Sequence, residues 1–231
     1  MSNSELKCKI LKQDDQNQNQ FDLCFKLIVV GDCGVGKTCL VIKAIKNYFE
    51  DLYAPTVGFE FLSFQVKIND QTIKLQIWDT CGQEIYRSLI TSFYRNSSLA
   101  IIVYSIDNAN SYKNLELWFN DIKTHSNPDI KIILIGNKVD LEDKREVSKE
   151  MGEQFCNINK LSLFMETSAK TGFNAENLFM EAAIMLYQEH LKNRNRSSRP
   201  GSLAAIPYIP PLTDQCSEDN EDRPKKNKCQ C

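Results

Sequence analysis

A glycine-rich stretch, residues 31–38, reads Gly-Asp-Cys-Gly-Val-Gly-Lys-Thr and fits the pattern G-x-x-x-x-G-K-[ST]. Glycines let the backbone curl so that successive N–H groups point inward, toward phosphate oxygens. In this pattern Lys37 reaches the β- and γ-phosphates, and the Thr38 hydroxyl can ligate Mg²⁺. An ordinary glycine-rich turn is the alternative, but a predicted strand precedes the pattern and a predicted helix follows it, which disfavours that reading. We predict a phosphate-binding loop formed by Gly31, Asp32, Cys33, Gly34, Val35, Gly36, Lys37, Thr38 and Cys39.

A second polar segment, Asn137-Lys138-Val139-Asp140, follows an apolar run further along the chain. The carboxylate of Asp140 can accept hydrogen bonds from both N1–H and the 2-amino group of guanine. Adenine lacks this pair of donors and would leave the acid unpaired in a desolvated pocket. We expect Asn137 to tie this loop to the phosphate loop and the Lys138 stem to cover the base. Alone the segment also reads as a polar turn; paired with the phosphate loop it predicts guanine-nucleotide binding.

A third segment, Glu166-Thr167-Ser168-Ala169-Lys170, follows the last predicted strand. In a guanine site, a backbone N–H near Ala169 would bind O6 of the base, and Lys170 would flank the ring, with Ser168 in the same loop. Taken by itself, the segment is better explained as a strand-to-helix turn capped by Ser or Thr.

The elements that must position these loops are strands and helices in alternation. Residues 99–106 and 130–135 are nearly continuous apolar runs, typical of central parallel strands. Residues 59–68 alternate in polarity and, with 72–78, predict a hairpin. Further strands are expected at 25–30 and 163–166, and helices at 37–48, 111–124, 148–156 and 174–191. This order predicts an α/β fold of three layers, in which helices cover both faces of a six-stranded, mostly parallel sheet with one antiparallel strand.

Ligands of such sheets bind beyond the carboxyl ends of the strands, where the three polar segments lie. We therefore predict a compact domain over residues 24–192, between a polar flexible extension at 1–23 and a flexible tail at 193–231. The tail carries prolines, then an acidic and a basic cluster, and ends in Cys229-Gln230-Cys231.

Composition excludes several classes of protein. Among 231 residues, 42% are hydrophobic and 25% charged, which rules out a wholly disordered chain. The net charge of −2 argues against a general nucleic-acid binder, and the apolar runs are too short to span a bilayer. The nine cysteines follow no disulfide framework and the start has no signal-peptide pattern, so we expect reduced thiols in the cytosol.

The order of these segments resembles the Ras superfamily of small GTPases, as does Trp78-Asp79-Thr80-Cys81-Gly82-Gln83-Glu84 after the third strand. The resemblance implies that Asp79 holds a water on Mg²⁺, that Gly82 offers its N–H to the γ-phosphate and that Gln83 orients the attacking water. It makes Lys37, Gly82 and Gln83 the catalytic residues of a GTPase with Mg²⁺ as cofactor.

Two more residues take their roles from the same resemblance. Thr56 matches the threonine of the first switch, which closes over Mg²⁺ and the γ-phosphate. Phe49 matches the aromatic side chain that packs edgewise on guanine. The implied Mg²⁺ ligands are Thr38, Thr56 and, through water, Asp79.

Four stretches resemble the Rab family in particular: Val57-Gly58-Phe59-Glu60-Phe61, Lys74-Leu75-Gln76-Ile77-Trp78-Asp79, Tyr86-Arg87-Ser88-Leu89 and Phe93-Tyr94-Arg95. In that family Phe61, Trp78 and Phe93 would form the aromatic triad that effectors read, and Val57, Gly58, Phe59 and Glu60 would complete the effector surface. Without the resemblance, such aromatics would be assigned to the core. With it, we expect a partly exposed patch.

The terminal cysteines Cys229 and Cys231 resemble the Rab type of double geranylgeranylation site. One lipid gives marginal membrane binding and two give long residence, and nearby lysines attract anionic lipids. A solvated tail with two inert thiols is the alternative. The resemblance implies a switch in vesicle-mediated transport on the cytoplasmic face of intracellular or plasma membranes, with a soluble pool. The implied partners of the monomer are GTP and GDP, an exchange factor, an activating protein, an escort protein, a GDP-dissociation inhibitor and effectors.

Three residues depart from the family pattern. Cys81 replaces the alanine expected before Gly82, Cys33 occupies a position that is often small or Ser, and Ile85 replaces the usual Arg. We expect Cys81 to slow or bias intrinsic hydrolysis. The sequence has no evident cis arginine finger, so turnover should be slow without an activating protein. The alternatives are a P-loop nucleoside or nucleotide kinase and a GTP-dependent scaffold with negligible hydrolysis.

Overall fold

The computed structural model describes residues 6–11, 20–51, 56, 58–82 and 92–197. Residues up to Asn193 form one compact unit. Its strands are β1 (Cys8–Leu11), β2 (Leu23–Val30), β3 (Phe59–Ile68), β4 (Gln71–Thr80), β5 (Leu99–Ser105), β6 (Lys131–Asn137) and β7 (Leu163–Glu166). Its helices are α1 (Lys37–Lys46), α3 (Ala109–Lys113), α4 (Leu115–His125), α5 (Lys149–Ile158) and α6 (Ala175–Ser197), with a 3-10 helix η2 at Val139–Lys144.

The strands form one sheet in the order β1-β3-β4-β2-β5-β6-β7. The pairs β4–β2, β2–β5, β5–β6 and β6–β7 are parallel, whereas β3 runs antiparallel to both of its neighbours, β4 and β1. The predicted α/β fold, with a mostly parallel sheet and one antiparallel strand, is confirmed. Among the described helices, none combines the length and the apolar character needed to cross a membrane.

The seventh strand, β1, corrects two predictions. Six strands were expected, and residues 1–23 were expected to form a flexible extension, yet Cys8–Leu11 pairs with Gln65–Ile68 along the edge of β3. The side chains of Leu6, Cys8 and Ile10 alternate along this segment and pack against the core. The polar composition of the surrounding residues hid this short alternation, so the prediction is wrong for β1.

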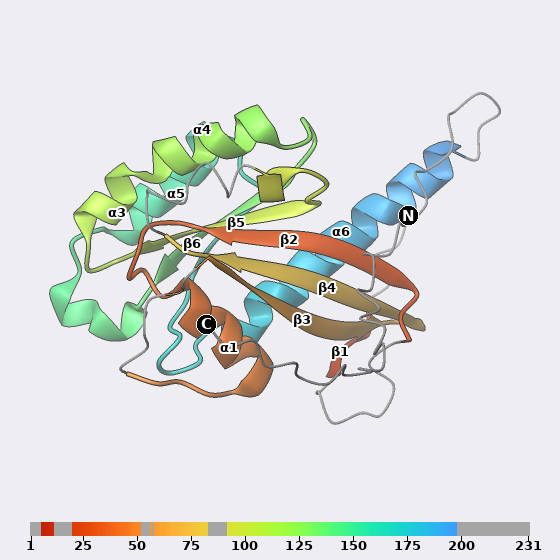
Figure 1. The fold of residues 1–231 in the computed structure, drawn as a ribbon, viewed down its shortest axis with the longest axis horizontal. Coiled ribbons are helices and arrows are strands. Elements are labelled where there is room, and N and C mark those ends of the chain that lie inside the picture. Colours follow the sequence, from red (N-terminus) through yellow and green to blue (C-terminus); the bar gives the residue numbers. More distant parts are fainter. Residues whose placement is uncertain (1–5, 12–19, 52–55, 57, 83–91, 198–231) are drawn as a thin grey trace, which may run out of the picture. The chain divides into compact units, whose positions relative to one another are not determined.

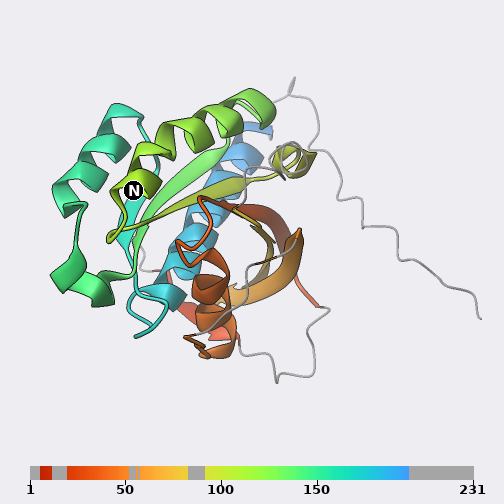
Figure 2. The ribbon, with the colours of Figure 1, turned by 60° about the vertical axis from the view of Figure 1, so that its left-hand side comes forward.

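Helices cover both faces of the sheet, as Figures 1 and 2 show. On one face α1 and α6 bury side chains such as Leu40 and Phe179 against the strands. On the other face α4 and α5 contribute Trp118 and Phe155 to a second cluster. Every residue of β5 is buried, as expected of a central strand covered on both sides. Burial of this apolar surface is the main driving force for the fold.

The helix predicted over residues 111–124 is interrupted. Asn114 lies between α3 and α4, and its own N–H donates to the carbonyl oxygens of Asn110 and Tyr112. Its side chain does not serve as a cap of α4; instead its amide donates to Asp32, 2.7 Å away in the phosphate loop. Local helical spacing could not predict this break, because the partner of Asn114 is 82 residues away in the chain.

Candidate functional site

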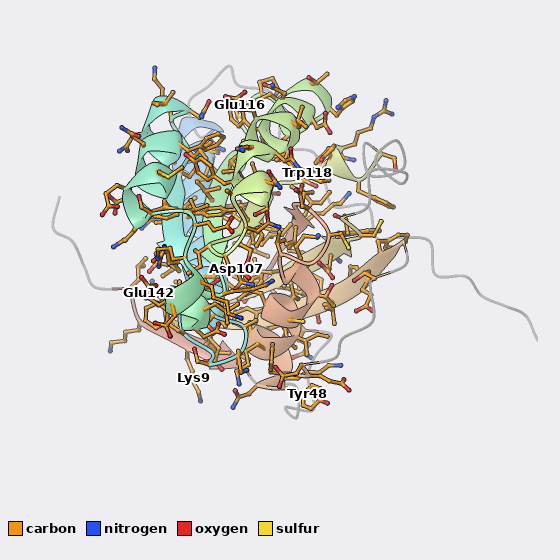
Figure 3. The ribbon with its side chains drawn as sticks, turned by 90° about the vertical axis from the view of Figure 1, so that its left-hand side faces the viewer. Lys9, Tyr48, Asp107, Glu116, Trp118 and Glu142 are labelled. Atoms are coloured by element: carbon orange, nitrogen blue, oxygen red, sulfur yellow. The ribbon has the colours of Figure 1, made fainter. Side chains whose placement is uncertain are left out.

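A cavity of about 410 Å³ lies at the edge of the sheet where the parallel strands end. Figure 3 views this edge and labels Asp107, just after β5, and Glu142, in η2 after β6. The cavity is lined by the loops after β2, β4, β6 and β7, the start of α1 and the segment after it. The lining residues are Cys33, Gly34, Gly36, Lys37, Thr38, Cys39, Phe49, Glu50, Asp51, Thr56, Thr80, Gly82, Asn137, Lys138, Asp140, Leu141, Ala169 and Lys170.

The phosphate loop leads directly into α1. Gly36 precedes the helix with φ 92°, and a Cβ at this position would lie 2.5 Å from Nδ2 of Asn137, so only glycine fits. The first N–H groups of a helix have no intrahelical partner and, with the helix dipole, favour an anion. This end of α1 therefore suits a phosphate group.

The ammonium group of Lys37 is buried at the same loop. Its Nζ donates to the carbonyl oxygens of Gly31 and Asp32, each at 2.8 Å. Burial lowers the pKa of Lys37, while the nearby carboxylate of Asp79 acts in the opposite direction. The protein thus keeps a cation within the curl of the loop, where it can neutralise a bound phosphate.

An oxygen cluster lies next to Lys37. The Thr38 hydroxyl donates to Oδ2 of Asp79, and the hydroxyl oxygens of Thr38 and Thr56 are 2.7 Å apart. The other carboxylate oxygen of Asp79, Oδ1, is buried without a hydrogen-bond partner among the described residues. Burial raises the pKa of Asp79 to about 6, although Thr38 and Lys37 counteract the shift. Hydroxyl and carboxylate oxygens are ligands that Mg²⁺ prefers, so these three residues fit a magnesium ion.

Asn137 joins three loops between the phosphate loop and the loops expected to bind the base. It is fully buried, and its Nδ2 donates to the carbonyl oxygen of Val35 at 2.9 Å. Its Oδ1 accepts hydrogen bonds from the Thr167 hydroxyl at 3.0 Å and from the Ala169 N–H at 3.3 Å. Asn137 therefore ties its loop to the phosphate loop, as predicted. The Ala169 N–H, expected to face O6 of guanine, is bonded to Asn137 here, so a bond to O6 has to share or replace this contact.

Asp140 projects into the cavity with one oxygen already fixed. Its Oδ1 accepts a hydrogen bond from the Ser168 hydroxyl at 2.5 Å. Ser168 is buried and outside the lining, so it orients Asp140 rather than facing the cavity. Two lysines flank this end, Lys138 at 3.9 Å from Asp107 and Lys170 at 3.4 Å from Asp51. The arrangement presents a carboxylate to a base between two long aliphatic stems.

Gly82 lies against the backbone of the phosphate loop. A Cβ there would be 2.3 Å from the carbonyl carbon of Asp32 and 2.4 Å from the amide nitrogen of Cys33. A side chain would therefore push the two loops apart. The neighbouring Cys81 donates its N–H to the Gly58 carbonyl at 2.9 Å and buries its side chain in the second apolar cluster.

The structure separates the predicted residues into those that line the cavity and those that do not. Gly31, Asp32, Val35, Asp79 and Ser168 lie outside the lining. The predicted residues Val57 and Gln83, residues 86–89 and the lipidation sites Cys229 and Cys231 lie outside the described residues. The sequence reasoning missed the lining residues Glu50, Asp51, Thr80 and Leu141, which are chain neighbours of predicted ones.

A group of aromatic rings lies near the carboxyl end of β4. The ring of Trp78 is 5.2 Å from that of Phe59, 5.6 Å from that of Phe61 and 5.1 Å from that of Phe93, measured between centroids. Phe59 and Phe61 are 46% and 50% exposed. These four residues, the aromatic surface, form a partly exposed patch that begins next to Gly58. Phe59 contacts both Trp78 and Phe93, so it belongs with the expected triad.

Comparison with known families agrees with this geometry. The family model described as "Ras family" matches residues 26–188. The match runs from β2 to α6 and includes every residue that lines the cavity. It covers well over half of the chain, together with the phosphate loop, the oxygen cluster and the base-reading loops. The chain belongs to the Ras family and is a small GTPase, a GTP-binding switch.

Proposed function

We propose that the protein is a switch of the Rab type, which hydrolyses GTP to GDP and phosphate and regulates vesicle-mediated transport. The observation that carries the Rab assignment is the aromatic surface, where Trp78 contacts Phe59, Phe61 and Phe93 and two of the rings are about half exposed. Large exposed aromatic groups mark surfaces that bind other proteins. Effectors are the partners that such a surface suits.

The backbone connects this surface to the cavity. Gly58 accepts a hydrogen bond from the N–H of Cys81. Thr56, two residues before Gly58, and Gly82, next to Cys81, both line the cavity. A γ-phosphate that contacts Thr56 and Gly82 would therefore also fix the segment that leads into Phe59. Loss of the γ-phosphate would release it, which makes effector binding depend on the nucleotide.

The proposed catalytic roles are those that the resemblance to small GTPases implies. The Lys37 ammonium neutralises charge on the β- and γ-phosphates, the Gly82 N–H binds a γ-oxygen, and Gln83 orients the water that attacks phosphorus. Thr38 and Thr56, with Asp79 through a water, would hold Mg²⁺, which would supply neutralisation of phosphate charge. Hydrolysis consumes one water, breaks the bond between the γ-phosphorus and the β–γ bridging oxygen, and leaves GDP.

Hydrolysis is tested by single-turnover phosphate release from GTP-loaded protein. We expect a slow intrinsic rate that an activating protein raises about 10³–10⁵-fold. The variant Gln83→Leu should bind GTP normally and lose most of its hydrolysis. A variant that hydrolyses GTP as fast as the wild type would refute the role of Gln83. Negligible release from the wild type, with or without an activating protein, would favour the GTP-dependent scaffold.

Membrane attachment belongs to the same proposal. We propose that Cys229 and Cys231 each carry a geranylgeranyl group and anchor the protein to the cytoplasmic face of intracellular or plasma membranes, with a soluble pool. An escort protein would deliver it to the transferase and a GDP-dissociation inhibitor would extract it. Incubation with Rab geranylgeranyltransferase and escort protein should add two lipids to the wild type and one to Cys231→Ser, by mass spectrometry. An unmodified wild type contradicts the Rab assignment.

A further inference from the structure

We propose that Asp32 is a positioning residue, which anchors the phosphate loop to the α3–α4 junction and thereby sets the rate of nucleotide release. The inference deepens the proposed function and rests on nucleotide binding in the cavity. It concerns the Asp32 side chain, which lies outside the cavity lining although its neighbours Cys33 and Gly34 are part of it.

Both oxygens of the Asp32 carboxylate are bound by the helical layer. Oδ1 accepts a hydrogen bond from Nε1 of Trp118 at 2.8 Å, and Oδ2 accepts one from Nδ2 of Asn114 at 2.7 Å. Figure 3 labels Trp118, which lies on the side of α4 next to the segment that carries the phosphate loop. A carboxylate that faced a di- or triphosphate would repel it, whereas the two donors hold this charge on the side of α4.

The main chain of Asp32 contacts the two groups that meet the terminal phosphates. Its carbonyl oxygen accepts a hydrogen bond from Nζ of Lys37 at 2.8 Å. The backbone of Gly82 is so close that a Cβ there would lie 2.3 Å from the carbonyl carbon of Asp32. Because carboxylate and carbonyl belong to one residue, the hydrogen bonds that fix the Asp32 side chain also restrain the backbone that holds Lys37 and limits Gly82.

The other end of the link is a rigid part of the fold. Asn114 ends α3 and begins α4, and its carbonyl oxygen accepts the N–H of Leu117 at 3.1 Å and of Trp118 at 3.3 Å. The side chains of Trp118 and Ile122 are buried in the second apolar cluster. Hydrogen bonds to a charged acceptor are about twice as strong as neutral ones. Asp32 is thus held by two strong bonds to an anchor that is itself packed.

Loss of the hydrogen bonds to Asp32 should speed the release of nucleotide without changing the selectivity for guanine. The base end depends on Asn137, Asp140 and Ser168, whose side chains bond to other residues than Asp32. The variant Trp118→Phe keeps an aromatic side chain but removes the indole N–H together with part of the ring system. We expect it to release GDP about tenfold faster, the effect of one lost hydrogen bond to a charged group. Guanine selectivity should stay within a factor of about two.

The test is the dissociation rate of a fluorescent GDP analogue from the full-length protein. It compares the wild type, Trp118→Phe, Asp32→Ala and the double variant. Asp32→Ala loses both bonds and should release GDP at least as fast as Trp118→Phe, and the double variant should be no faster than Asp32→Ala. Tyr112→Phe is the matched control, since it removes the bond from the Tyr112 hydroxyl to the Met151 carbonyl on the same helical layer, at 2.8 Å. This control should release GDP like the wild type.

The inference is overturned if the single variants release GDP within twofold of the wild-type rate. It is also overturned if the increases in release rate of the two single variants multiply in the double variant. A purely structural role would lower the melting temperature of Trp118→Phe and leave its rate of GDP release unchanged. A wild type with no measurable GDP affinity would instead overturn the proposed function. As a second readout, Trp118 emission in the Trp78→Phe background should change when GDP is removed. Unchanged emission counts against the anchor even if Trp118→Phe does not fold.

Discussion

The two ends of the cavity are built differently. At the base end, Asn137 bonds to Val35, Thr167 and Ala169, and one oxygen of Asp140 bonds to Ser168, so both side chains are held by protein partners. At the phosphate end, Oδ1 of Asp79 is buried with no partner among the described residues, and the buried ammonium of Lys37 donates to two carbonyl oxygens.

Burial has a clear electrostatic cost at the phosphate end. It raises the pKa of Asp79 to about 6 and lowers the pKa of Lys37, because both charged forms lose water that the protein does not fully replace. The base end is organised to select a ligand, whereas the phosphate end holds charges that a ligand and its metal ion would complete. Affinity should therefore depend mainly on the phosphate end, and selectivity and stability of the unliganded protein on the base end.

The largest effect is expected for Lys37→Met. The variant loses a buried cation that is proposed to contact the β- and γ-phosphates, so the affinity for GDP and GTP should fall about 1,000-fold or more. Titration with a fluorescent nucleotide measures it. Lys46→Met, an exposed lysine in the last turn of α1, is the matched control and should bind like the wild type. A loss below about tenfold would mean that the phosphate end does not dominate affinity.

A smaller effect, on selectivity, is expected for Asp140→Asn. The amide can donate to the 2-oxo group of xanthine but cannot accept from both donors of guanine, so affinity for GDP should fall about 100-fold and affinity for XDP should rise. Competition of the two nucleotides for each protein measures this. Asp143→Asn, in η2 but outside the cavity lining, should keep its preference for guanine. If Asp140→Asn keeps that preference as well, the carboxylate does not read the base.

The two ends of the cavity should differ most clearly in how much they contribute to the stability of the nucleotide-free protein. Asn137→Ala leaves the Val35 carbonyl, the Thr167 hydroxyl and the Ala169 N–H without their partner and should lower the free energy of unfolding by about 3 kcal/mol. Lys37→Met removes a desolvated charge and should change it by less than about 1 kcal/mol. Urea unfolding after removal of nucleotide and metal by EDTA tests both. Equal losses in the two variants would remove the distinction between the ends.

The smallest effect is expected for Cys81→Ala. The thiol packs in the second apolar cluster, so its removal should lower the free energy of unfolding by about 1 kcal/mol, measured by urea unfolding. Because the side chain faces the core, single-turnover hydrolysis should stay within about twofold of the wild type. Clearly faster hydrolysis in Cys81→Ala would support the expectation from the sequence that Cys81 slows the reaction.

Much of this architecture could be predicted from local pattern. Alternating polarity located β3 at Phe59–Ile68, the bounds that the structure shows, and the polar loops after the strands indicated the cavity. Helical spacing could not show the break at Asn114, and average composition hid β1.

The supporting residues of the site could not be predicted in this way. Thr167 holds Asn137 from 30 residues away, and Trp118 holds Asp32 from 86 residues away. Such contacts exist only once the sheet has formed. Neither a threonine after a strand nor a tryptophan on the apolar face of a helix shows in the local sequence which distant residue it will contact. Local motifs predict the residues that would contact a ligand directly, whereas the hydrogen bonds that hold those residues in place depend on the tertiary fold.

The central claim is that one cavity binds the phosphates at one end and reads guanine at the other. The most direct measurement is competition of GDP, GTP and ATP for purified full-length protein that has been stripped of nucleotide and supplied with Mg²⁺. We predict that GDP and GTP bind at least about 1,000-fold more tightly than ATP, because adenine leaves Asp140 unpaired. Equal affinity for ATP and GTP would contradict the account.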